Sequence, residues 1–502
     1  MRFASQRVGL LILMVAMFVI VQAVPSRLLN HALHHDEALS IHLGRAALQH
    51  APCDGACAQH TGSVMMQPMM AAAGDRWGGL FGARLVSVGF GVLLLIMVAA
   101  TGWQVMGAAG GLLGGVLLLA QAPFLYVSRM ALYDVVSTAW LAAAVMCLVT
   151  AERRRTQAVA GWWLLGGALS LAAACLAKYV TAIYLLPALA IVLWRWRLRQ
   201  GLVCFVAPLA VLGWWYASSA LWPVLPDVLA QLRNVASRGQ ATFQWIEITE
   251  MLIRWLIWPA VLAAAALGLS GRSSMASDGK EPRTPAAGLD RQPARGFWVV
   301  LIALASIVPV VHLATGSVQG LNKNVVQSLL FLSPAAAFGL WSICRAFRIE
   351  RGINAQGIVI GLVLLLMFAG GLRNRAWLER QYPDLSPVVA ELAPLVGPRT
   401  VVMTDTDALF RYALEARLPP ERVVLTYWVD FEGAGGEAGA VRFVEAQHPD
   451  YVVLDGYYGQ AAQHERLKQA MGANYQLRRQ WPMRMSWGER TVELYERKGV
   501  MG

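Results

Sequence analysis

The chain has 502 residues, of which 57% are hydrophobic and 14% are charged, whereas soluble domains carry about 25% charged residues. Together with repeated long uncharged runs, this composition excludes an ordinary soluble protein and indicates a polytopic helical membrane protein. The net charge of +12 does not point to nucleic acid, because Lys and Arg cluster in short segments between apolar runs.

The first apolar run follows a basic start, Met1 to Arg7, and extends to about Val24. No small-residue cleavage site follows it, so we expect a retained transmembrane helix and not a signal peptide. Runs long enough to span a bilayer predict about eleven helices. They lie at about 8–25, 83–101, 104–121, 135–151, 158–176, 179–194, 201–221, 251–269, 297–315, 325–343 and 355–371.

The distribution of basic residues predicts the orientation. If the N-terminus is cytoplasmic, the basic clusters at 153–155, 195–199, 272–295 and 345–351 all fall on the cytoplasmic side. The segment 270–296, rich in Ser, Pro, Gly and charge, is then a flexible cytoplasmic linker. The outer face receives loops at 26–82 and 222–250 and everything that follows the last helix.

The sequence after the last apolar run predicts a soluble α/β domain. The segments "TVVMT", "RVVLTY", "DYVVLD" and "RTVELYERK" are typical of strands, and "DALFRYALEA" and "HERLKQAMG" have helical periodicity. Alternation of strands and helices favours a small α/β sandwich. The Gly-rich "GAGGEAGA" at 433–440 lacks a lysine for phosphate, so we interpret it as a flexible loop. We therefore predict a membrane domain over 1–375 and an outer domain over 376–502.

The stretch "HALHHDEALS" at 31–40 places Asp36 and Glu37 directly after the first apolar run. One interpretation is structural: a hydrated acidic pair begins an amphipathic surface helix, with Asp36 near its N-cap. The other is chemical, because an acid at the membrane interface can act as general base on a lipid-borne substrate.

Several charged residues also approach the outer face. Asp134 and Arg129 lie before the predicted fourth helix, Lys178 lies between the fifth and sixth, and Arg84 and Lys323 lie at helix starts. Each cation can be an interfacial side chain that reaches the headgroups. The positive-inside rule disfavours cations on the outer face. Several of them there, beside the acids, suit the binding of a phosphate.

Histidines and cysteines offer weaker sites. His31, His34 and His35 have helical spacing and are weak candidates for a divalent metal site. Cys53 and Cys57 lie in a polar outer loop, where an oxidising compartment would allow a disulfide. The four other cysteines lie in or beside apolar runs and are interpreted as packing residues.

Five segments resemble the GT-C membrane glycosyltransferases, in particular the group that uses polyprenyl-phosphate sugars and includes protein O-mannosyltransferases and lipid A aminoarabinose transferases. The matching segments are "HHDEALS", "HTGSVMMQPMM", "GLFGARLVSV", "FLYVSRMALYDVVSTAW" and "LAKYVTAIYLLPAL", so the resemblance covers roughly residues 1–200. Further on, "LNKNVVQSLLFLSPA" matches the family's Lys-x-x-Arg-Tyr element only at Lys323, since Val326 and Gln327 replace the Arg and Tyr.

The resemblance implies an α-helical GT-C domain with a site at the outer membrane face. It implies that Asp36 acts on the acceptor, that Asp134 is the second acid, and that cations hold the donor phosphate. The candidate catalytic residues are Asp36, Glu37 and Asp134, and the candidate substrate-binding residues are Arg84, Arg129, Tyr133, Lys178 and Lys323.

The expected activity is inverting transfer of a sugar from a polyprenyl-phosphate donor to a lipid, glycan or protein acceptor. We expect a multi-pass protein of the bacterial inner membrane with a periplasmic C-terminal domain. No metal is required, because fixed cations can stabilise the leaving phosphate, although a divalent ion is compatible with the site. Two alternatives stay open: a transporter or flippase of lipid-linked sugars, and a non-catalytic subunit of glycan assembly.

Overall fold

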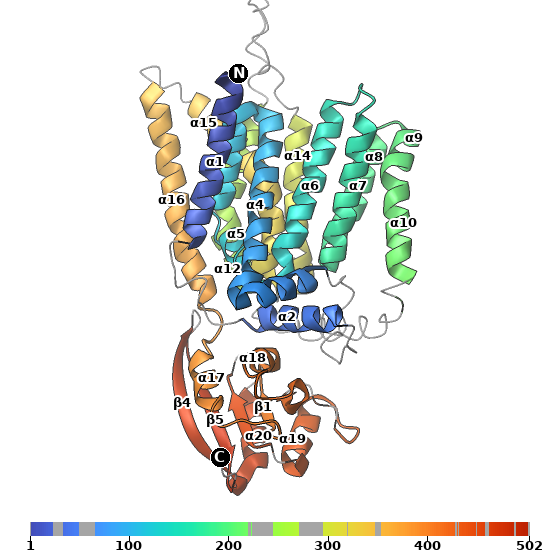
Figure 1. Cartoon of the computed structure of the whole chain (residues 1–502). Coiled ribbons are helices and arrows are strands. Elements are labelled where there is room, and N and C mark those ends of the chain that lie inside the picture. Colours follow the sequence, from blue (N-terminus) through green and yellow to red (C-terminus); the bar gives the residue numbers. More distant parts are fainter. Residues whose placement is uncertain are drawn as a thin grey trace, which may run out of the picture.

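The computed structural model describes residues 2–23, 34–49, 66–218, 222, 244–270, 295–318, 320–346, 353–426, 429, 431–447, 449–456, 461–485 and 488–499. A bundle of long helices forms one part of the molecule, and a small α/β domain lies beyond one end of the bundle (Figure 1). The N-terminus lies at the opposite end of the bundle. The helix α2 (His35–Leu48) lies across the end that faces the α/β domain.

The other helices of the membrane part agree with the apolar runs within a few residues at most boundaries. They are α1 (Arg2–Ala23), α4 (Met66–Leu119), α5 (Ala122–Val127), α6 (Tyr133–Arg153), α7 (Ala160–Ala177), η1 (Tyr179–Tyr184), α8 (Leu185–Arg195), α9 (Leu198–Gly201), η2 (Leu202–Val206), α10 (Ala207–Tyr216), α12 (Gln244–Ser270), α14 (Arg295–Thr315), α15 (Leu321–Ala346) and α16 (Ile353–Glu379).

Within the described residues, 8 helices are long and apolar enough to cross a membrane, and the apolar segments Leu11–Gln22 and Tyr179–Arg195 are shorter. The prediction of a multi-pass membrane protein is therefore confirmed. The number of about eleven crossings stays a prediction. The helix α12 begins at Gln244, so part of the segment predicted as an outer loop at 222–250 is helical.

The long helix α4 is not continuous. Gly79 and Gly107 adopt φ angles of 60° and 79°, which glycine tolerates far better than other residues. A Cβ atom on Gly82 would lie 2.0 Å from the carbonyl oxygen of Gly74, so the chain folds back on itself at the first break. The first arm of α4 therefore lies beside α2 at the end of the bundle, and the later arms enter the bundle (Figure 1).

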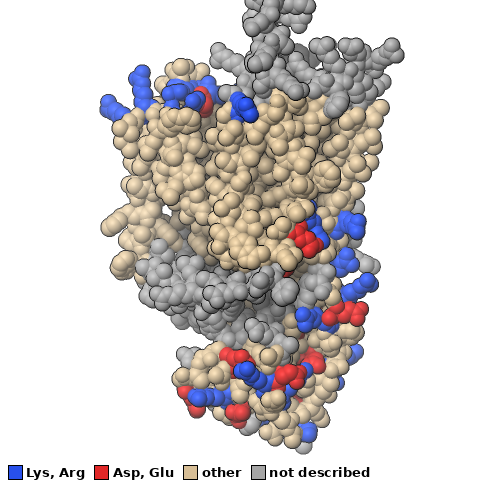
Figure 2. Space-filling model, turned by 180° about the vertical axis from the view of Figure 1, so that it is seen from behind, with Lys and Arg blue, Asp and Glu red and all other residues tan. Residues whose placement is uncertain are grey.

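The surface of the bundle is a broad band of uncharged side chains (Figure 2). Lys and Arg gather at the end farthest from the α/β domain. The connections after α6 and α8 carry Arg153–Arg155 and Arg195–Arg199. Such a charge distribution is typical of a protein oriented by the positive-inside rule.

The α/β domain contains one five-stranded sheet in the order β2-β1-β3-β5-β4. Strands β1 (Val402–Thr404), β2 (Val423–Leu425) and β3 (Tyr451–Leu454) are parallel, and β5 (Gly488–Arg497) pairs antiparallel with β3 and with β4 (Tyr475–Met485). The other elements are α17 (Ser386–Leu392), α18 (Asp407–Ala413), η4 (Pro420–Arg422), α19 (Gly436–Gln447), α20 (Ala461–Met471) and η5 (Gly472–Asn474).

Two features of this domain differ from the sequence expectation. Strand β4 was not predicted, because its outward residues are charged or polar and only its ends are buried. The Gly-rich segment is only partly a loop, since α19 begins at Gly436, after turns in which Gly433 and Gly436 have φ angles of 71° and 63°.

The α/β domain attaches to α2 and α4 through a polar junction. Arg45 of α2 pairs with Asp75 of α4 at 2.5 Å and also with Glu415, while the Tyr412 hydroxyl donates to Asp75 at 2.5 Å. Ala408 of α18 packs against apolar residues of α2. The junction therefore holds α2 between the membrane bundle and the α/β domain.

Some predicted features lie outside the described residues. They are Cys53 and Cys57, His31, most of the outer loop at 222–250 and most of the linker at 270–296.

Candidate functional site at the end of the helix bundle near the α/β domain

The start of α2 is fixed by a capping box. His34 is the N-cap residue: its Nδ1 accepts a hydrogen bond from the Asp36 amide at 3.0 Å, and Glu37 Oε2 accepts one from the His34 amide at 3.2 Å. Asp36 lies near the N-cap, as expected, but the cap residue itself is His34. Asp36 lies inside the first turn, and its carboxylate takes no part in the cap.

Glu37 is fully buried and forms a two-pronged ion pair with Arg84. Arg84 Nε donates to Glu37 Oε1 at 2.9 Å and Arg84 Nη2 donates to Oε2 at 2.7 Å. The amide of Ala131 also donates to Oε1, at 2.8 Å. Arg84 and these backbone donors hold the pKa of Glu37 below its usual value, although burial opposes ionisation. One carboxylate thus connects α2, α4 and the connection between α5 and α6.

Asp36 points in another direction and pairs with Lys323, near the start of α15. The Asp36 side chain is 29% exposed, whereas that of Lys323 is 12% exposed. Burial opposes ionisation of Asp36, but Lys323 together with nearby His34 outweighs it and holds the pKa of Asp36 well below the usual range. Asp36 is therefore an ionised carboxylate whose side chain is partly exposed.

Asp134 forms the second acidic pair, with Lys178 at the turn after α7. The Lys178 ammonium also donates to Asn324 Oδ1 and lies 5.3 Å from the centre of the Tyr133 ring. Both Asp134 and Lys178 are buried. Among the described residues, Asp134 Oδ2 has no hydrogen-bond partner, so this carboxylate keeps a free acceptor.

His312 of α14 completes this network. Its Nδ1 lies 2.7 Å from the Ser317 carbonyl, which accepts only, so Nδ1 donates and Nε2 accepts from Asn324 Nδ2 at 3.1 Å. That arrangement directs the Asn324 oxygen toward Lys178. Sequence reasoning missed Asn324 and His312; the signal for Asn324 was its place next to a candidate cation in "LNKN".

The two acid–lysine pairs meet through neighbouring residues of α15, because Lys323 contacts Asp36 and Asn324 contacts Lys178. Of the predicted site residues, the structure thus brings Asp36, Asp134, Tyr133, Lys178 and Lys323 into one region.

The remaining candidates form ion pairs with other residues near this region. Glu37 and Arg84 pair with each other. Arg129 Nη1 donates to Glu379 Oε1 at 2.6 Å, and Arg375 lies 3.1 Å from the same oxygen.

The weak metal candidates do not form a ligand set in the described part of the chain. His34 uses Nδ1 for the cap, and burial lowers its pKa to about 4, so the ring is neutral at pH 7. His35 is also buried. No group of three or more His, Cys, Asp or Glu side chains lies together as possible metal ligands in the ranges that the structure describes.

Comparison with known proteins shows which family and which fold this chain resembles. The model of the dolichyl-phosphate-mannose-protein mannosyltransferase family matches residues 75–238. No curated protein matches the whole chain or a part of it.

Among solved structures, ArnT from Cupriavidus metallidurans bound to undecaprenyl phosphate has a TM-score of 0.59 at 13% identity, covering 98% of this chain and 99% of that one. The oligosaccharyltransferase AglB from Archaeoglobus fulgidus, in complex with an inhibitory peptide and a dolichol-phosphate, has a TM-score of 0.55 at 11% identity, covering 99% and 75%. The resemblance to the GT-C glycosyltransferases is confirmed, and the structural likeness establishes their fold.

Proposed function

From the GT-C fold and the paired carboxylates, we propose that the protein is an inverting glycosyltransferase that moves a sugar from a polyprenyl-phosphate donor to an acceptor. The observation that carries the proposal is the convergence of two acid–lysine pairs on adjacent residues of α15, Lys323 and Asn324, at the end of a membrane bundle. A phosphate on a lipid and a base for an acceptor hydroxyl need that combination of charges in that place.

The donor phosphate binds to Lys178 and Lys323 in this proposal. The lipid tail stays among the apolar helices, and the phosphate reaches the two ammonium groups at the end of the bundle. Bound there, the leaving phosphate is stabilised by fixed positive charges while its bond to the sugar breaks. The unpartnered Oδ2 of Asp134 can accept a hydrogen bond from a hydroxyl of the donor sugar, with Tyr133 beside it.

Asp36 is the proposed base for the acceptor. The acceptor hydroxyl gives its proton to the Asp36 carboxylate, its oxygen attacks the anomeric carbon, and polyprenyl phosphate leaves; a single displacement inverts the configuration at that carbon. With its pKa held low by Lys323, Asp36 is a weak base in the free protein. A donor phosphate that takes over part of the Lys323 contact would raise the basicity of Asp36 when the sugar is in place.

For Glu37 and Arg84 the geometry favours a positioning role. Both side chains are buried and engage each other, so neither presents a free group to substrate. Their pair fixes the first turn of α2 and thereby the direction of Asp36.

We further propose that the Arg-rich end of the bundle is cytoplasmic and that the α/β domain lies in the periplasm of a bacterium, on the outer side of the inner membrane. The structure fits this orientation because the candidate site and the α/β domain share one end of the bundle (Figure 1). Lys178 and Lys323, which pair with Asp134 and Asp36, supply the positive charge for the phosphate in the proposed reaction.

A transfer assay tests the proposal. The purified full chain is incubated with labelled polyprenyl-phosphate sugars, hexosyl and pentosyl in parallel, and with an envelope extract as acceptor source, with and without EDTA. Label should move to an acceptor and free polyprenyl phosphate should appear. In proteoliposomes, a flippase would move intact labelled lipid between leaflets without cleaving it, and a non-catalytic subunit would do neither.

A further inference from the structure

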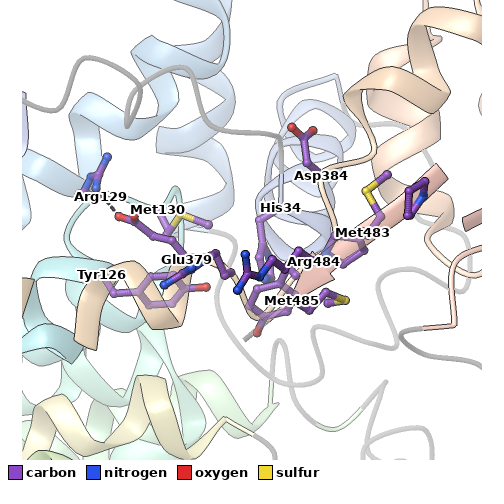
Figure 3. A pocket seen from close by; sticks show the side chains of 13 residues that line it. His34, Tyr126, Arg129, Met130, Glu379, Asp384, Met483, Arg484 and Met485 are labelled. Carbon is purple, nitrogen blue, oxygen red and sulfur yellow. Dashed lines mark hydrogen bonds and ion pairs between the residues drawn. The ribbon is translucent and has the colours of Figure 1, made fainter. Parts of the chain in front are cut away.

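A pocket lies between the membrane domain and the α/β domain, next to the proposed base. It has a volume of about 260 Å³. On one side it is lined by His34 and by Tyr126, Arg129 and Met130 at the end of α5. Glu379 lies on the side of Tyr126 and Arg129, and Asp384 and the end of β4, including Arg484, lie across from them (Figure 3).

Buried hydrogen-bond donors in this pocket lack partners. The Tyr126 hydroxyl, Nε2 of His34, and Nε and Nη2 of Arg129 have no hydrogen-bond partner among the described residues. Tyr126 and Arg129 are 2% and 3% exposed, and His34 is 4% exposed. A buried polar group without a partner destabilises a protein, so three such side chains around one pocket indicate a missing ligand.

His34 Nε2 and the Arg129 guanidinium are donors only in this setting, and the Tyr126 hydroxyl can donate as well as accept. His34 Nδ1 accepts from the Asp36 amide and the ring is neutral, so its hydrogen is on Nε2. The Tyr126 hydroxyl points toward the middle of the pocket, in the direction of His34 and Arg484 (Figure 3). The ligand must therefore supply acceptor oxygens.

The charge around the pocket is positive. Arg129, Arg380 and Arg484 line it, against Glu379 and Asp384. Glu379 is already shared between Arg129 and Arg375, which leaves the cluster with an uncompensated cation. Burial lowers the pKa of Arg129 to about 9 although Glu379 opposes the shift, as is typical of a cation with too little negative charge around it.

We propose that this interdomain pocket binds an anionic group of the acceptor, a phosphate or a carboxylate. The proposal rests on the proposed glycosyltransferase function and adds the substrate class. His34 joins the two sites: it lies two residues before Asp36, so an acceptor anchored by its anion at His34, Tyr126 and Arg484 places a neighbouring hydroxyl at the base. The α/β domain thereby contributes directly to acceptor selection, through β4.

Binding to the purified full chain tests the proposal without any need for turnover. The donor phosphate site is first saturated with undecaprenyl phosphate. The shift in melting temperature and the apparent Kd are then measured with N-acetylglucosamine 1-phosphate, with glucuronic acid, and with N-acetylglucosamine as the neutral control. Variants Tyr126→Phe and Arg484→Gln each remove one donor group, while Lys178→Gln alters the donor site and Arg490→Gln is a control on the neighbouring strand.

We expect an anionic sugar to bind and the neutral sugar not to bind. Each pocket variant should weaken binding roughly tenfold to a hundredfold, the usual effect of losing a hydrogen bond to a charged group. Lys178→Gln and Arg490→Gln should retain it. The phosphate and carboxylate compounds reveal which anion the pocket prefers.

Equal binding of the neutral sugar, or loss of binding in Lys178→Gln with retention in both pocket variants, would overturn the proposal. Failure of the glycosyltransferase function is a separate result, because it would leave anion binding intact while transfer is absent.

Discussion

The sharpest distinction that the structure makes is between Asp36 and its neighbour Glu37, and matched amide substitutions at the two positions test it. Asp36→Asn removes the charge that accepts a proton and preserves size. His34 and not Asp36 caps α2, so this change leaves the capping box in place. General-base loss typically costs a factor of roughly 100 to 10,000 in rate, which is about 3–5 kcal/mol of transition-state stabilisation.

Glu37→Gln should mainly lower the stability of the protein. It leaves the Arg84 guanidinium buried without a carboxylate, and breaking one side of a buried ion pair costs roughly 3–5 kcal/mol of stability. Asp36→Asn also leaves Lys323 without its anion, but the Lys323 side chain is 12% exposed against 1% for Arg84, so water reaches it more easily and the cost to stability is smaller.

The assay measures melting temperature and transfer rate for both purified variants, with wild-type protein in parallel. Asp36→Asn should melt near the wild-type temperature and transfer at most one hundredth as fast, whereas Glu37→Gln should melt clearly lower. Near-normal turnover of Asp36→Asn would refute its role as the base. A loss of stability in Asp36→Asn as large as that of Glu37→Gln would show that the division between a reactive and a structural acid is mistaken.

Four other predictions concern the donor site, the cap of α2, the two cysteines of the first loop and the α/β domain. Lys178→Ala should weaken donor use by roughly 1.5–3 kcal/mol, seen as a raised apparent KM for the polyprenyl-phosphate sugar; an unchanged value would remove Lys178 from the phosphate site. The pKa of His34 falls from 6.5 to about 4 on folding, so the unfolded chain binds more protons between these pH values and stability should fall as the pH drops through that window. His34→Asn, which retains a capping side chain, should flatten this pH dependence of the melting temperature, and an unchanged profile would contradict it. Cys53 and Cys57 should be oxidised to each other in protein isolated without reductant, and thiol labelling at both positions would disprove this. Residues 383–502, expressed alone, should give a folded and inactive α/β module, since its strands and helices enclose their own apolar cores; a failure to fold would mean that the junction with α2 is essential.

Much of the architecture could be predicted because its signals are local. Apolar runs of spanning length depend only on composition within about twenty residues, and the parallel strands β1, β2 and β3 are buried on both faces, so they appear as continuous apolar runs. Strand β4 could not be found in this way. It lies at the edge of the sheet with most of its side chains exposed, so its sequence has no apolar pattern.

The candidate site shows the same division between local and long-range information. Charged residues at the outer ends of apolar runs are visible in the sequence, but their partners are not. Lys323 and Asp36 are separated by 287 residues, and no local pattern indicates that one would neutralise the other. Asp36 and Glu37 are also indistinguishable by type and position. Only packing separates them, because consecutive helical residues point about 100° apart and therefore reach different surroundings.

This angular separation explains how one short turn can hold both a rigid and a reactive carboxylate. Glu37 faces α4 and is fully buried, so protein groups must supply its hydrogen bonds. Arg84 and the Ala131 amide supply them. Asp36 faces α15, and its ion pair must be reversible, since a base that is permanently neutralised cannot accept a proton. In the proposed mechanism Lys323 meets that need, because the phosphate of the donor takes over part of its contact with Asp36 when a sugar is present to be transferred. On this argument the strength of the Asp36–Lys323 pair in the free protein suppresses unproductive proton transfer, and donor binding supplies the free energy that relieves it.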